Sequence, residues 1–137
     1  MARRKSRILA FQALYSWEMG NKDLDSLLEF SWVEGEKLEN TSENDFQFSR
    51  MLVLGTIENL EEIDNVIKNN LNKSWDFERV NKIDLAILRL SIYSLLYQKD
   101  IHPSIVIDEA IDISKEFGPD DSFKFVNALL DNIRKTL

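Results

Sequence analysis

The sequence predicts an all-α fold, in which two helical bundles pack together within a single domain spanning residues 1–137. Apolar residues recur at helical spacing through almost the whole chain. Only four glycines and two prolines interrupt this pattern, and no run of β-branched residues alternates between turn signals. We place the division near residues 72–80, with sub-bundles of about residues 1–75 and 76–137.

The first two helices follow from apolar spacing and from the residues at their ends. A helix is expected from Arg4 to Met19, because apolar side chains lie three or four residues apart and Gly20 then favours a helix end. Three leucines within residues 24–28 indicate a short second helix that ends near Trp32.

The middle of the chain combines an acidic loop with the longest predicted helix. Residues 33–44 are acidic and lack an apolar period, so we expect a loop there. Thr41 and Ser42 then provide an N-cap for one continuous helix, which asparagines end near residues 69–72. A connector around Trp75 follows.

Three helices are expected in the second half. Asn81, with Asp84 three residues later, indicates the start of a very apolar helix that should form the buried centre. Residues 99–103 break the pattern, Ser104 is expected to cap a further helix, and Gly118, followed by proline, ends it. The last helix has three N-cap candidates, Asp120, Asp121 and Ser122.

The composition argues against several kinds of site. The chain has no cysteine and a single histidine, His102, so disulfides and thiolate or histidine metal sites are not expected. We expect neither a metal nor a cofactor. No apolar run approaches the roughly 20 residues that span a bilayer, and the basic start runs directly into a helical pattern, unlike a secretory signal. The expectation is a cytoplasmic protein without a membrane segment.

The distribution of charge points towards RNA. The net charge of −7 argues against a nucleic-acid partner, but residues 1–17 contain no acid. Their basic residues are Arg3, Arg4, Lys5 and Arg7. Positive charge at a helix N-terminus costs about a few tenths of a kcal/mol per residue, so external phosphates would account for this arrangement. Gln12 could then read a base, and Tyr15 or Trp17 could stack on unpaired bases.

The basic segment has two alternative roles. It could bind a membrane surface through its positive charge. It could also be a frayed, solubilising tail, with Tyr15 and Trp17 packed in the core.

The sequence shows no convergent set of catalytic groups. It contains no Gly-rich phosphate loop, no nucleophile elbow and no paired His/carboxylate metal spacing. Asp108, Asp112 and Glu116 lie four residues apart on one predicted helix face, which could hold a divalent ion only if a further ligand converged. A solvated polar face explains these carboxylates better. We therefore expect no enzymatic activity.

Two ordered blocks of residues resemble the NusB family. The first block is Arg-Arg-Lys-Ser-Arg at 3–7 followed by Gln-Ala-Leu-Tyr-Ser-Trp at 12–17. The second block comprises, in order, Ile-Leu-Arg-Leu at 87–90, Asp-Glu-Ala-Ile at 108–111, Phe-Gly at 117–118 and Asp-Ser-x-Lys-Phe-Val-Asn at 121–127. The resemblance spans nearly the whole chain, although residues 21–80 contribute only the helical pattern.

The resemblance implies two antiparallel three-helix bundles, with no catalysis. It also implies binding to the single-stranded boxA element of ribosomal RNA leaders together with NusE, a small-subunit ribosomal protein. The pair would join the RNA polymerase antitermination complex and support ribosomal RNA transcription. By motif match, the RNA-binding residues would be Arg3, Arg4, Lys5, Arg7, Gln12, Tyr15, Asp121, Lys124 and Phe125. Asp84 and Arg89 would face the protein partner.

Three positions depart from the family pattern. Asp108 replaces the usual Asn and so lacks an amide donor, while Ala128 replaces a Gly and adds a methyl group. Leu85 stands where a polar residue is common. Phe125 also has two possible roles, because aromatic residues on amphipathic helices usually pack in the core but can also stack on a base.

Two alternative functions stay open. NusB-like bundles also occur as amino-terminal RNA-binding domains of ribosomal RNA methyltransferases, which would continue into a Rossmann-like domain with a Gly-rich cofactor loop. The second alternative is a helical protein-interaction module, which predicts no salt-sensitive affinity for RNA.

Overall fold

The computed structural model describes residues 3–20, 23–35, 39–72 and 76–137. All regular structure within these residues is helical, which confirms the all-α prediction. The helices are α1 (Arg4–Met19), α2 (Leu24–Leu28), α4 (Glu43–Glu58), α5 (Leu60–Asn70), α6 (Lys82–Tyr97), α7 (Pro103–Phe117) and α8 (Ser122–Lys135), with a 3-10 turn, η1, at Phe77–Arg79.

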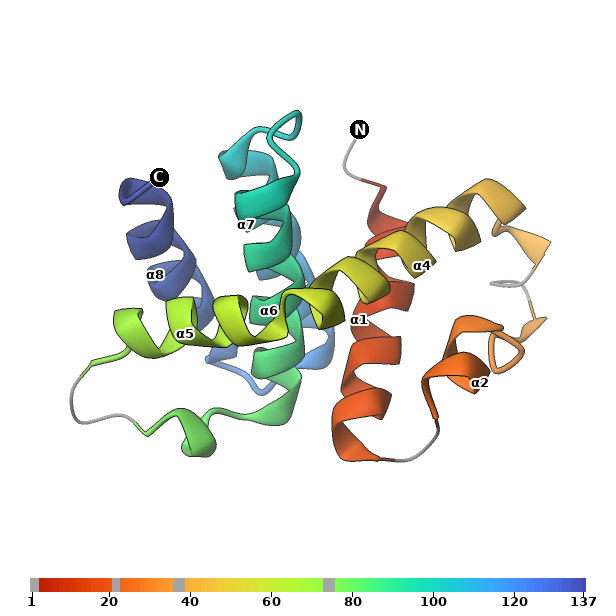
Figure 1. Ribbon diagram of the computed structural model, residues 1–137, viewed down its shortest axis with the longest axis horizontal. Coiled ribbons are helices and arrows are strands. Elements are labelled where there is room, and N and C mark those ends of the chain that lie inside the picture. Colours follow the sequence, from red (N-terminus) through yellow and green to blue (C-terminus); the bar gives the residue numbers. More distant parts are fainter. Residues whose placement is uncertain (1–2, 21–22, 36–38, 73–75) are drawn as a thin grey trace.

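Helix α6 lies at the centre of the molecule, as its apolar sequence predicts. It packs against α1, α4, α5, α7 and α8, and its residues are buried on nearly every side. Figure 1 shows α4 and α5 following one another across the front, with α6 behind them near the middle, α8 towards one end and α1 and α2 towards the other. Helix α5 also packs against α8, and the division into sub-bundles near residue 75 stays a prediction.

The predicted ends of α1 and α4 are confirmed. Gly20 ends α1 in the left-handed conformation, with φ 72° and its N–H donating to carbonyl oxygens of the last helical turn. Ser42 caps α4 in a capping box, because its hydroxyl accepts from the Asp45 N–H while the Asp45 carboxylate accepts from the Ser42 N–H.

The prediction of one continuous middle helix is wrong, because the helix breaks at Asn59. The Asn59 side-chain amide donates to the Gly55 carbonyl oxygen at 2.8 Å, and the Asn59 backbone N–H donates to the same oxygen at 3.2 Å. Such a bond from an Asn side chain to the backbone competes with the regular helix. The break redirects the chain, and α5 buries Ile63 and Ile67. The predicted loop is also partly wrong, since its residues 35 and 39 are helical.

Two predicted caps in the second half are corrected. His102, and not Ser104, caps α7, because its ring Nδ1 accepts from the Ser104 N–H at 3.1 Å and Pro103 takes the first helical position. Asn81 caps α6 by accepting from the Ile83 N–H, but Asp84 does not complete that cap. The connector expected around Trp75 lies outside the described residues.

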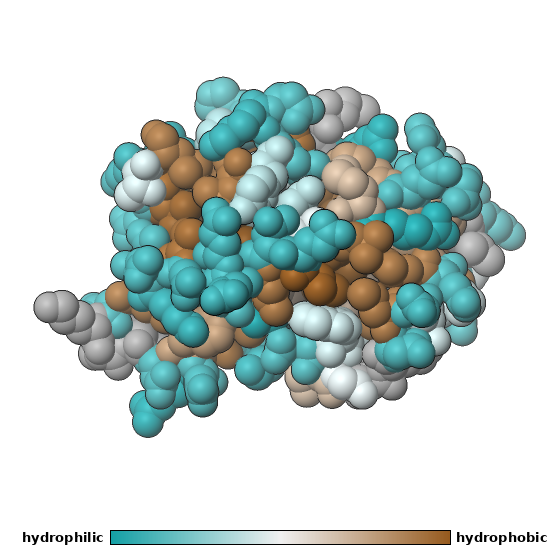
Figure 2. All heavy atoms as spheres, viewed as in Figure 1, coloured by the Kyte–Doolittle hydropathy of each residue, from teal (hydrophilic) through white to brown (hydrophobic). Residues whose placement is uncertain are grey.

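One face of the molecule carries a hydrophobic area over α4, surrounded by hydrophilic side chains (Figure 2). Met51 and Leu54 of α4 are among the exposed large apolar residues. No helix in the described ranges has both the length and the apolar character needed to cross a membrane.

Candidate functional site

Two adjoining hollows run along one face of α1. The first has a volume of about 530 Å³ and the second about 280 Å³, and both are lined by Leu9 and Gln12. The first is also lined by Phe11, Tyr15, Ser16, Trp32, Val33, Glu34, Ile83 and Phe117. The second continues towards the basic end of α1, where Lys5 and Glu116 line it. We call this pair of hollows the α1 groove.

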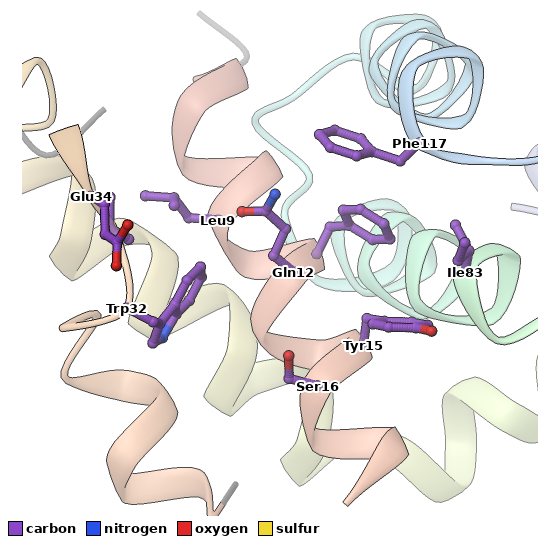
Figure 3. Close-up of a pocket in the computed structure, with 10 residues that line it drawn as sticks. Leu9, Gln12, Tyr15, Ser16, Trp32, Glu34, Ile83 and Phe117 are labelled. Atoms are coloured by element: carbon purple, nitrogen blue, oxygen red, sulfur yellow. The ribbon is translucent and has the colours of Figure 1, made fainter. Parts of the chain in front are cut away.

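Four segments of the chain contribute to the first hollow of the α1 groove. Figure 3 shows Gln12 and Ser16 rising from α1 along its middle, with Trp32 and Glu34 on one side. Tyr15, the start of α6 and the end of α7 lie on the other side. The groove therefore brings residues together that are far apart in sequence.

Several polar side chains in the groove are available to a ligand. Gln12, Ser16 and Glu34 make no side-chain hydrogen bond or ion pair with any described residue. Tyr15 and Trp32 are partly buried and pack against the core, and both still line the hollow. An apolar hollow with a few unpaired polar groups is the usual form of a ligand site, and aromatic walls suit flat rings.

The basic start of α1 is partly neutralised within the chain. Arg4 donates to Glu109 at 2.9 Å and pairs with Asp112. The hydrogen bond with Glu109 is the main cause that raises the pKa of Arg4. Lys5 donates to the backbone oxygen of Asn40 at 2.7 Å. External phosphates are therefore not needed to explain why these charges are tolerated, although the Arg4 side chain stays 53% exposed.

The structure places Arg7 in the interior, which corrects its assignment to the RNA surface. The residue is 2% exposed, and its guanidinium donates to the Ser94 hydroxyl of α6 at 3.0 Å. Burial lowers the pKa of Arg7 to about 10. Phe11 and Leu14 lie four and seven residues further along α1 and are also buried. Helical periodicity therefore contained a signal that Arg7 faces the core.

The remaining basic residue of this segment also has a partner. The Arg3 guanidinium lies over the Phe48 ring, 4.4 Å from its centroid. Such a contact stabilises a cation on an aromatic face.

The predicted site residues of α8 form a second location, outside the first hollow of the groove. Asp121 and Lys124 have side chains 84% and 70% exposed, and they pair at 3.6 Å. Phe125 is partly buried against the core and lines a separate hollow with the end of α5. Phe125 therefore does not line the first hollow of the α1 groove, where Gln12 and Tyr15 lie.

Asp84 is buried, although the family resemblance implied that it faces the protein partner. It is 5% exposed, and its Oδ2 accepts from the Ser122 hydroxyl at 3.0 Å while its Oδ1 has no hydrogen-bond partner. Burial raises the pKa of Asp84, against the opposing effect of the Ser122 hydrogen bond. Because Ser122 begins α8, this bond ties the start of that helix to α6.

Arg89 is also engaged inside the chain. It is 6% exposed and binds both carboxylate oxygens of Asp64 at 2.9 Å, and it donates to Glu18 at 2.6 Å. Burial alone would lower the pKa of Arg89, but the hydrogen bonds to Asp64 and Glu18 together raise it. Any contact of Asp84 or Arg89 with a partner would thus act through the helices that they hold together.

Several residues of the α1 groove were not predicted from the sequence. Trp32, Glu34 and Ile83 carry no signal that places them beside α1, because packing across long sequence separations brings them there. Phe117 belongs to a motif that the sequence singled out, but no role was given to it. In the part of the chain that the structure describes, no group of three or more potential ligands could hold a metal ion.

The chain resembles known proteins over nearly its full length. It is 56% identical over 134 residues to the transcription antitermination protein NusB of Treponema denticola, covering 98% of this chain and 96% of that protein. The solved structure of T. maritima NusB has a TM-score of 0.84 and 37% identity, covering 97% of this chain and 90% of that one.

A more distant solved structure shares the fold. It comes from the complex of antitermination factors NusB and NusE with double-stranded RNA, with a TM-score of 0.80 and coverage of 99% of this chain and 98% of that one. Its 24% identity shows a likeness in fold alone. The family model of NusB matches residues 4–135. The chain therefore belongs to the NusB family of transcription antitermination proteins.

Proposed function

We propose that this antitermination factor binds single-stranded boxA-type RNA together with NusE, and that it acts in the cytoplasm without catalytic activity. It would deliver the bound RNA to RNA polymerase and support ribosomal RNA transcription. The observation that carries the RNA-binding part is the α1 groove, which combines unpaired polar groups, aromatic walls and a basic end.

The groove suits an unpaired RNA strand better than a duplex. Stacking on Tyr15 and Phe117 requires a base whose face is free, and single-stranded RNA exposes such faces. Arg3, Arg4 and Lys5 lie at the opening of α1, where they would contact phosphates. Asp121, Lys124 and Phe125 on α8 would contact a further part of the same strand.

NusE is the protein partner that we propose. Family membership supports this choice, and one chain in the solved complex of NusB, NusE and RNA has the same fold as this protein. Asp84 and Arg89 would contribute by holding the starts of α6 and α8 and the position of α5, because their charges lie inside the chain.

A binding titration tests this function. Labelled boxA-like single strand and the corresponding duplex would be titrated with the protein, with and without NusE, at several salt concentrations. We expect the single strand to bind more tightly than the duplex, NusE to strengthen binding, and the affinity to fall as salt rises.

The aromatic contact has a matched pair of variants. Tyr15→Leu should weaken single-strand binding by about 1–3 kcal/mol, because it removes one stacking face. Tyr97→Leu, at an exposed position near the end of α6, should leave binding unchanged. Equal affinity of the wild type and the Tyr15 variant would contradict the placement of RNA in the groove.

A further inference from the structure

We propose that the Glu34 side of the α1 groove receives one unpaired base carrying an exocyclic amino group, and that Glu34 selects such a base against uracil. This inference rests on the RNA-binding function proposed above and adds a specificity to one part of its surface. Glu34 is not among the residues that the family motifs mark for RNA.

The geometry provides a flat wall and a free acceptor at the same place. Glu34 and Trp32 lie on the same side of the hollow in Figure 3, opposite Tyr15 and Phe117. The Trp32 indole N–H donates to the Leu27 carbonyl oxygen at 3.0 Å, and its ring lies 5.5 Å from that of Phe30. These contacts hold the Trp32 ring in place, so it can serve as a fixed wall for a base.

The surroundings of Glu34 favour a ring that brings its own polar edge. Leu9 and Val33 are buried residues that line the same hollow, and they offer no hydrogen bond from their side chains. The Glu34 carboxylate and the Gln12 amide make no side-chain hydrogen bond or ion pair with the described residues. A ligand that covers the apolar wall would therefore find polar side-chain partners at Glu34, Gln12 and Ser16, with the Tyr15 hydroxyl on the opposite side of the hollow.

The chemistry of the carboxylate determines which base fits. An ionised carboxylate only accepts hydrogen bonds, whereas the Gln12 amide can both donate and accept. Cytosine, adenine and guanine each carry an amino group that donates to such an acceptor. Uracil carries carbonyl oxygens on both sides of its ring N–H, and these would repel the carboxylate. The site should therefore favour a base with an amino group.

Simple charge repulsion by Glu34 would change RNA affinity in the opposite direction to base selection. A carboxylate beside RNA repels phosphates, so its removal should strengthen the binding of every strand. Base selection instead predicts that removal weakens the binding of amino-bearing strands relative to uridine-only strands. The two effects can be separated by comparing strands that differ in one base.

The probes are a short oligouridylate and otherwise identical strands in which one uridine is replaced by cytidine, adenosine or guanosine. A homopolymer can shift along the groove until the replaced base occupies the hollow. We expect the wild type to bind at least one replaced strand roughly tenfold more tightly than oligouridylate, the size of a good base-specific contact.

The variants are Glu34→Ala and, as the matched control, Glu116→Ala. Both side chains are exposed and both line the groove, but Glu116 lies in the second hollow. Glu34→Ala should abolish the preference without weakening the binding of oligouridylate, and Glu116→Ala should keep the preference. The thermal midpoint should stay unchanged in both variants, because neither side chain is buried.

The outcomes separate this inference from the proposed function. If the wild type binds no strand, both the proposed RNA-binding function and the base selection by Glu34 are wrong. If it binds all strands equally, or if Glu34→Ala keeps the preference, the groove can still bind RNA but Glu34 does not select the base. Equal loss of preference in both variants would also overturn the inference, because it would assign the effect to charge alone.

Discussion

At the scale of single residues, Arg4 has two competing sets of partners. In the free protein it is held by Glu109 and Asp112 of α7, while bound RNA would offer phosphates to the same guanidinium. Asp112 is exposed, so its ion pair with Arg4 is of the surface kind and contributes little to stability. Asp112 should therefore reduce RNA affinity more than it stabilises the fold.

Asp112→Asn should raise RNA affinity, because the RNA phosphates then no longer compete with Asp112 for the Arg4 guanidinium. A surface ion pair is worth up to about 1 kcal/mol, so the gain should be about twofold to fivefold. Asp108→Ala is the control, since it removes the same charge from the same helix without introducing the amide of the family's usual Asn, and Asp108 pairs with no described residue. Filter binding at low salt would measure both. An equal gain in the two variants would show only an effect of net charge.

Asp84 should make stability depend on pH. Its folded-state pKa is raised by burial above the unfolded value of about 3.9. The stability that it contributes is therefore present below the unfolded pKa and is lost as the pH rises through the folded pKa. At pH 7 the buried carboxylate is a cost.

Asp84→Asn should consequently be more stable than the wild type at pH 7, because the amide keeps an acceptor for Ser122 without the charge. The advantage should shrink as the pH falls through the raised folded-state pKa of Asp84 and should be gone below about 4, where both side chains are neutral. Urea unfolding at a series of pH values measures this difference. A difference that does not change with pH would contradict the burial argument.

At the scale of elements, the Tyr93 side chain of α6 lies directly against Gly55 of α4. A Cβ atom at this position would lie 2.3 Å from Cζ of Tyr93, which is too close for any real contact. The absence of a side chain at Gly55 therefore lets the Tyr93 ring lie against α4. The ring therefore bridges α6 and α4 at this position.

Gly55→Ala should lower the free energy of unfolding by about 1–3 kcal/mol, because the ring or the helices must move. In a Tyr93→Ala background the same substitution should instead be neutral or stabilise by up to about 1 kcal/mol, since alanine favours the helix. Chemical denaturation of the four proteins in this double-mutant cycle measures the coupling. Additive effects would mean that the Tyr93 ring is not the obstacle.

At the scale of the whole molecule, Arg89 joins three helices. It lies on α6 and binds Asp64 of α5 and Glu18 of α1, while Lys82 also approaches Glu18 at 3.7 Å. The network ties the first helix and the middle of the chain to the central helix. It therefore helps to fix the helices that surround the α1 groove.

Arg89→Ala should destabilise the fold by about 3–5 kcal/mol, because it leaves the Asp64 carboxylate partly buried without a cation. Arg134→Ala, which removes an exposed pair with Asp131, should change stability by about 1 kcal/mol or less. Thermal and urea unfolding of both variants measure the contrast. An Arg89 variant as stable as the wild type, but deficient in NusE binding, would return Arg89 to the partner surface.

The sequence alone determined most of what depends on neighbouring residues. Apolar spacing and capping residues predicted the bounds of α1 and the start of α4, because helical hydrogen bonds and caps form within a few residues. The ordered motifs identified the family. They also marked Gln12 and Tyr15, which lie in the α1 groove.

Only the tertiary structure decided which side chains meet. The break at Asn59, the burial of Arg7 and the pairing of Arg4 with Glu109 all depend on how helices pack across long sequence separations. The position of Glu34 beside Gln12 depends on the same packing. Spacing along one helix tells which face a residue occupies, but the packing of the whole molecule determines whether that face meets the core, a carboxylate or an open groove.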